Sequence, residues 1–207
     1  MINKFLKAKH WQLFTLMFGI PILLQIITMI LMFSNLDTNG NSDPVNTLNS
    51  FKLFPIIMIL YMGLFFGWFW SIGIGMQKFI PNEIAMKVNR FKIFFFIPLI
   101  YILFININIG TTFYGISSGD NAIGGIVGKM LFVVIPLHLF SMFCMFYLLY
   151  FVSKTLKTAE LKREVTFSDF LGEFFMIWFF PFGIWVIQPR INKLVNGKNT
   201  TGNNVYN

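Results

Sequence analysis

Few side chains in the apolar segments of this chain could do chemistry, and four of them fall at one depth. Gln25, Tyr61, Asn106 and His138 each lie eight residues inward from one end of a long apolar run, or about 12 Å along a helix axis. Polar side chains that face lipid are costly. We therefore predict a polar intramembrane layer in which at least two of the four point inward and bond to each other or to trapped water. Such a layer either holds the helices together through hydrogen bonds or forms a site for a ligand or a proton.

His138, Ser141 and Cys144 form a second row of polar side chains, because they recur every three residues along the fourth apolar run. This spacing brings the side chains to one side of a helix. Catalysis would also need paired carboxylates, a nucleophile with its base, or clustered metal ligands. The four long apolar runs contain no Asp or Glu, and the chain has one cysteine and no zinc-protease, hydrolase or phosphate-loop motif. We expect a non-enzymatic protein with no catalytic residues, metal or cofactor.

The composition indicates which elements carry these side chains. Only 12% of the 207 residues are charged and 56% are hydrophobic, whereas a soluble domain has about 25% charged residues. A helix of about 20 apolar residues crosses a hydrocarbon core of about 30 Å. Four runs without charged residues meet this length: 11–33, 53–76, 93–114 and 130–152. The predicted fold class is an all-α integral membrane protein with four transmembrane helices, forming a single helical membrane domain over residues 1–190.

A fifth apolar run, residues 174–187, has 14 residues and would reach only about 21 Å as a helix. Pro181 and Gly183 place a helix breaker and a permissive residue at its centre, which favours a bend there. We expect residues 170–187 to form a short re-entrant or interfacial hairpin on the cytoplasmic side, with Ser168 or Asp169 as the helix N-cap. A fifth transmembrane helix is the alternative.

The basic residues predict the orientation of the spans. Lys and Arg gather on the cytoplasmic side of membrane proteins. With four spans, 14 of the 16 Lys and Arg residues share one side, in the segments 1–10, 77–92, 153–173 and 188–207. Both termini are therefore expected in the cytoplasm, and richness in Ile, Asn, Lys and Phe suits the inner membrane of a bacterium with an AT-rich genome.

The same charges suggest what the chain contacts. Basic residues between apolar runs are typical of contact with anionic lipid headgroups. Nucleic acid is not expected, because the basic residues do not form one contiguous face. Residues 191–207 are rich in Asn, Thr and Gly, so we expect a disordered tail.

A helix-packing groove is predicted along the second run, where small residues recur every four positions. These are Gly63, Gly67, Ser71 and Gly75. Such spacing lets helix backbones approach closely in lipid. The groove could hold a helix of the same chain, a membrane-protein partner or a second copy in a homo-oligomer. The expected function is a membrane component that acts through helix contacts with a membrane partner, and the alternative is a small transporter or channel subunit.

Overall fold

The computed structural model describes residues 2–34, 54–117 and 123–203, and these form helices joined by short turns. Four described helical segments are long and apolar enough to cross a membrane. They are His10–Leu31, Phe54–Phe79, Val88–Thr111 and Phe132–Leu161. The prediction of an all-α chain with four long apolar helices is confirmed.

The first of these segments is built from several helical pieces. The short helix α1 (Ile2–Lys7) precedes α2 (His10–Phe14), a π-helical turn η1 (Thr15–Gly19) and α3 (Ile20–Ser34). In the π turn the Ile20 N–H donates to Thr15 O, one residue further back than in an α-helix. Pro21 follows directly, and a proline ring displaces the carbonyl four residues earlier. The π turn therefore falls where the proline disturbs the backbone hydrogen bonds of the helix.

Three longer elements complete the set of apolar helices. They are α5 (Phe54–Gly75), which continues into the 3-10 turn η3 (Gln77–Phe79), α6 (Val88–Ser117) and α7 (Ile123–Leu161). Helix α7 ends where Lys162 adopts a left-handed conformation with φ of 55° and donates its N–H to Thr158 O at 2.9 Å. Such a residue just after the last helical position is a common helix stop.

The fifth apolar run forms a helical hairpin of α8 (Phe167–Trp178) and α9 (Phe180–Asn203). The predicted bend at Pro181 and Gly183 is displaced, because the helices break at Phe179. Pro181 lies in the first turn of α9, where its missing N–H breaks no helical bond. Gly183 instead allows a close approach, since a Cβ there would lie 1.7 Å from Met176 O.

Two predictions about the flanks of this hairpin are wrong. The N-cap of α8 is Thr166 rather than Ser168 or Asp169, because Thr166 and Asp169 form a reciprocal capping box. The tail is not disordered from residue 191, because α9 continues to Asn203. Ile191 and Val195, one helical turn apart, bury their side chains in the core. The last four residues of the predicted tail, 204–207, lie outside the described residues.

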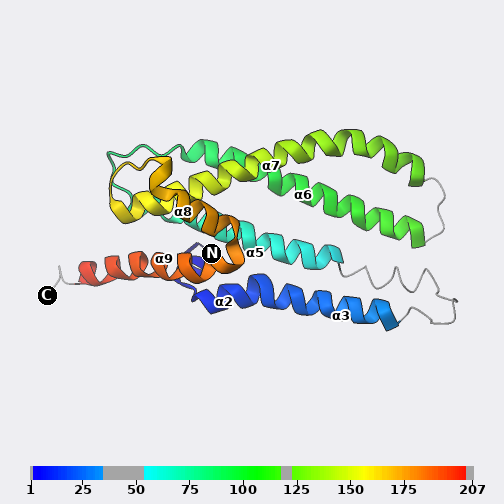
Figure 1. Ribbon diagram of the computed structural model, residues 1–207, viewed down its shortest axis with the longest axis horizontal. Helices are drawn as coiled ribbons and strands as arrows, with labels where there is room; N and C mark the ends of the chain where they lie inside the picture. The colour runs from blue at the N-terminus through cyan, green and yellow to red at the C-terminus, as the bar shows by residue number, and fades with distance from the viewer. Residues whose placement is uncertain (1, 35–53, 118–122, 204–207) are drawn as a thin grey trace.

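The apolar helices lie side by side with their long axes roughly aligned, and α8 and α9 pack at one end of them (Figure 1). Helix α8 starts near the end of α7 and runs part of the way along the bundle, and α9 returns to the same end and extends past it (Figure 1). The core includes the fully buried side chains of Trp68, Phe69, Leu148 and Ile184. Helix α5 is central, with half of its most apolar window buried.

Candidate functional site

A cavity of about 570 Å³ lies between α5, α6 and α7, and the α8–α9 turn closes part of it. Its lining recurs at helical spacing, as in Tyr101, Ile105 and Ile109 of α6. Residues at intervals of three and four share one face of a helix. The three long helices therefore turn a common apolar face toward the cavity, which is partly open to the surface.

Asn106 is the most buried polar side chain of the predicted layer, with 3% of its surface exposed, and it lines the cavity. Its Nδ2 donates to Ile102 O at 3.2 Å. A carbonyl only accepts, so this bond fixes which atom of the amide is the oxygen. The buried Oδ1 has no hydrogen-bond partner among the described residues.

His138 also lines the cavity, opposite Tyr101 of α6. The Tyr101 hydroxyl lies 3.0 Å from His138 Nδ1, and the histidine tautomer sets which of the two donates. Tyr101 is buried, whereas His138 retains an exposed surface. The bond joins α6 to α7 at the level of the predicted polar layer.

Of the four residues in the predicted layer, Tyr61, Asn106 and His138 border this cavity. Gln25, half-buried on α3, is not among the described residues that line it. The hydrogen-bond partner of His138 is Tyr101, which the depth count did not select. Tyr101 lies five residues before Asn106, about 140° around the helix axis and about 7.5 Å along it, so the depth count gave no signal for it.

The row that follows His138 is divided between the cavity and the core. Ser141 is buried and lines the cavity, whereas Cys144 is fully buried in the helix packing. No group of three or more metal-ligating side chains occurs in the described part of the chain.

The small residues of α5 face different surroundings. Cβ atoms at Gly67 and Gly75 would lie 2.9 Å from Phe5 and 2.5 Å from Ile2, so both glycines are packed against α1. Ser71 is buried and donates its hydroxyl to Gly67 O at 2.7 Å. A Cβ at Gly63 would meet no atom within 4 Å. The helix α1 of the same chain therefore lies against the part of the predicted groove that contains Gly67 and Gly75.

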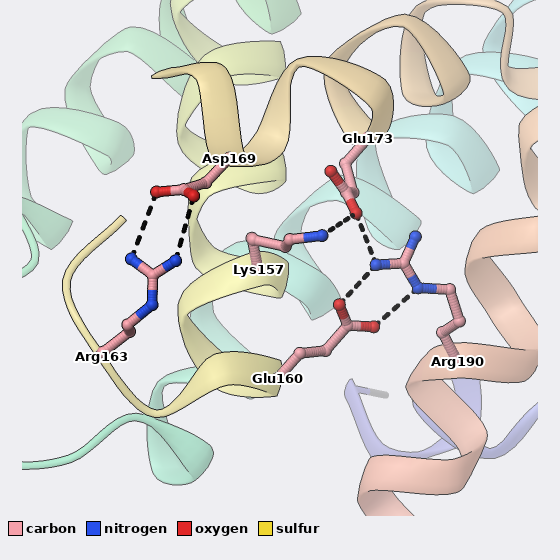
Figure 2. A network of polar contacts seen from close by, with 6 residues as sticks. All are labelled: Lys157, Glu160, Arg163, Asp169, Glu173 and Arg190. Atoms are coloured by element: carbon pink, nitrogen blue, oxygen red, sulfur yellow. Dashed lines mark hydrogen bonds and ion pairs between the residues drawn. The ribbon is translucent and has the colours of Figure 1, made fainter. Parts of the chain in front are cut away.

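An ion-pair cluster links α7, α8 and α9 at the end of the bundle where the hairpin starts (Figure 2). Glu173 of α8 accepts from Lys157 Nζ at 2.9 Å and from Arg190 Nη2 at 2.5 Å. Arg190 of α9 also donates from Nε to Glu160 at 2.7 Å. Arg190 thus bridges two carboxylates, one from α7 and one from α8.

The carboxylate of Glu173 is well buried, with 6% of its side chain exposed. Burial raises its pKa, but hydrogen bonds from Arg190 and Lys157 outweigh burial and leave the pKa below its ordinary value. The partners of Glu173 explain how a charge fits beside an apolar run. Sequence reasoning missed this cluster, because its cations lie 16 residues before and 17 residues after Glu173.

A separate, exposed pair joins Arg163 to Asp169 at 3.0 Å (Figure 2). Hydrogen bonds from the Arg163 guanidinium, and then from the Thr166 backbone and hydroxyl, lower the pKa of Asp169 to about 2. This pair therefore supports the capping box at the start of α8.

Buried amides fix the N-terminal helix to the bundle. Gln188 of α9 is fully buried, and its Nε2 donates to Phe5 O and Ala8 O, both at 2.9 Å. Its Oε1 accepts from Trp68 Nε1 at 3.0 Å. The carbonyls at the end of a helix lack intrahelical partners, so Gln188 satisfies groups of α1 while holding α5 and α9 together.

Comparison of the chain with protein-family models, curated proteins and solved structures found no match. Over its described residues the chain is all-helical, with four helices long and apolar enough to span a membrane, and this fold defines its class.

Proposed function

We propose that this chain is a multi-pass protein of a bacterial inner membrane that holds an apolar or amphiphilic molecule in the cavity between α5, α6 and α7. The observation that carries the proposal is the cavity itself, of about 570 Å³. Small-molecule sites are concave, about 300–1,000 Å³ in volume, and mostly apolar with a few placed polar groups. Binding here requires no catalysis, so the protein acts as a non-enzymatic component.

The partly open side of the cavity suits access from lipid. Among its lining residues, Met142, Phe146 and Trp178 also have exposed surface. An apolar molecule dissolved in the bilayer could enter past such side chains without crossing water. A function based on contacts with a membrane partner has less support, because α1 packs against Gly67 and Gly75 of the groove that suggested it.

A tryptophan in place of Met145 should prevent the apolar or amphiphilic molecule from binding in the cavity. Met145 lines the cavity, so Met145→Trp adds side-chain volume inside it. The matched control is Phe143→Trp on the same helix, because Phe143 is 60% exposed and lies outside the lining. A photoactivatable long-chain hydrocarbon in vesicles should label cavity peptides of the wild type, and Met145→Trp should reduce that labelling at least about tenfold, equivalent to about 1.4 kcal/mol.

The Phe143→Trp variant should keep wild-type labelling of the cavity peptides. The proposal fails if cavity peptides are labelled no more than the lipid-facing surface of α3. It also fails if both tryptophan variants lower labelling equally.

The proposed topology places both termini in the cytoplasm and makes the α8–α9 hairpin re-entrant. Its support is the return of α9 to the end where α8 starts (Figure 1), together with the basic residues near that end. In a Cys144→Ser background, Asn41→Cys should react with an impermeant thiol reagent in intact cells, and Asn199→Cys should react only after lysis. Labelling of both residues from outside would contradict the hairpin and indicate five spans.

Transport is the second candidate, favoured by one contact. Trp178 and Phe180, on either side of the α8–α9 turn, line the cavity, so movement of this turn would change access to it. Flux of a small apolar solute into liposomes, blocked by Met145→Trp and not by Phe143→Trp, would support transport over simple binding.

A further inference from the structure

We propose that the cavity selects a neutral amphiphile that carries a hydroxyl group, and that Asn106 Oδ1 accepts the hydrogen bond from that hydroxyl. This inference rests on the proposed function and names the class of molecule bound. It concerns the head group, whereas the proposed function requires only that an apolar chain fits the cavity.

Asn106 carries a buried hydrogen-bond acceptor without a partner among the described residues. Asn106 Nδ2 is engaged by Ile102 O, which leaves Oδ1 pointing away from that carbonyl. Oδ1 is buried and lacks a partner among the described residues. A buried acceptor without a partner is unfavourable. Because Oδ1 has almost no accessible surface, the Asn106 side chain must turn toward the cavity for a ligand to reach this atom. A ligand that supplies an O–H donor there removes the cost, and an acceptor-only head group does not.

The charge of the lining limits which head groups the cavity accepts. No Lys, Arg, Asp or Glu occurs among the described residues that line the cavity. An ionised carboxylate or phosphate would lie there without a counter-charge, which is strongly unfavourable in an apolar site. The Tyr101–His138 pair also lines the cavity, but its two facing atoms already bond to each other. A neutral head group fits this environment.

The polarity of the lining changes along the cavity. Its α7 lining extends from His138 to Leu149, which corresponds to about 16 Å along a helix axis. Asn106 and His138 line the cavity on α6 and α7, whereas Ile177 and Trp178 lie on the hairpin. There the rings of Trp178 and Phe146 lie 4.9 Å apart, and those of Phe180 and Tyr61 lie 6.0 Å apart. A hydroxyl at one end and an alkyl chain toward the hairpin match this arrangement.

The test uses long-chain photoactivatable probes of equal length that differ only in head group. They are the alcohol, its methyl ether and the carboxylic acid, applied to the full chain in vesicles at mildly alkaline pH. We expect the alcohol to label cavity peptides about tenfold more efficiently than the ether or the acid, consistent with one hydrogen bond. Asn106→Leu, close in size to the native residue, should abolish this preference while an apolar probe still labels the cavity.

The matched control is Asn108→Leu. Asn108 lies two residues along α6, outside the cavity lining, and donates to Phe104 O at 2.7 Å. This variant should keep the preference for the alcohol. Equal labelling of the wild type by all three probes would overturn the hydroxyl selectivity and leave the proposed function intact. A preference that persists in Asn106→Leu would overturn the role of Asn106. Absence of cavity labelling by every probe would overturn both proposals.

Discussion

Replacing Arg190 with alanine should lower the free energy of unfolding by about 2–3 kcal/mol, because it removes the cation shared by two carboxylates. Glu173 would keep Lys157 as its partner, whereas Glu160 would lose the Arg190 pairing at the α7–α9 contact. The figure lies below that of a fully buried pair because the Arg190 side chain is 30% exposed. Equilibrium unfolding in mild detergent measures the change.

The exposed pair provides the matched control. Arg163→Ala breaks a contact in which the arginine side chain is 57% exposed, so its cost should stay below about 1 kcal/mol. Equal losses from the two alanine variants would contradict a central role for Arg190. A Glu160→Gln substitution added to Arg190→Ala should recover part of the loss, because it removes the carboxylate that loses its Arg190 partner.

Acid should weaken the same cluster by titration. The pKa of Glu173 is lower in the folded chain than its ordinary value of 4.5. Its ionised form therefore stabilises the fold at pH values above 4.5, and this contribution is lost as the pH falls through the lower, folded-state pKa. The unfolding free energy of the wild type should fall over that acidic range, and that of Glu173→Gln should fall less.

A methyl group at Gly183 should be the second most damaging change. A Cβ there would overlap Met176 O at 1.7 Å, and because that atom is backbone, α8 and α9 must move apart. Gly183→Ala is expected to cost about 2–3 kcal/mol. Thermal unfolding gives the loss, and limited proteolysis near Phe179 should accelerate as the turn opens.

Gly172 of α8 offers the matched control, since a Cβ there meets no atom within 4 Å. Gly172→Ala should be neutral or stabilise the helix by up to about 1 kcal/mol. A Gly183→Ala variant as stable as Gly172→Ala would mean that the two helices do not pack this closely.

Local sequence patterns predicted the long elements and not their connections. Each of the four apolar helices was predicted from an uninterrupted run of apolar residues, a signal that needs no information from the rest of the chain. The hairpin was predicted from the short fifth run, but its bend was misplaced by two to four residues. A proline fits the first turn of a helix as well as a break, and the glycine serves the contact with Met176.

The candidate site was predicted in part for a similar reason. Depth along each run suggested that Tyr61, Asn106 and His138 share a level, and these residues border one cavity. Depth does not give the rotation of a helix about its axis, so Gln25 was included. Tyr101 was missed because it lies five residues deeper along its run than Asn106. The pairing of Arg190 with Glu160 and the capping of α1 by Gln188 depend on tertiary packing, which spacing along the chain does not reveal.

The most direct measurement of the central claim is native mass spectrometry of the protein extracted from its own membranes in a mild detergent. We predict that the wild type and Phe143→Trp each carry one neutral, hydroxyl-bearing amphiphile, and that Met145→Trp is released without it. Identical ligand-free masses for all three proteins, or an identical adduct on all three, would contradict the account.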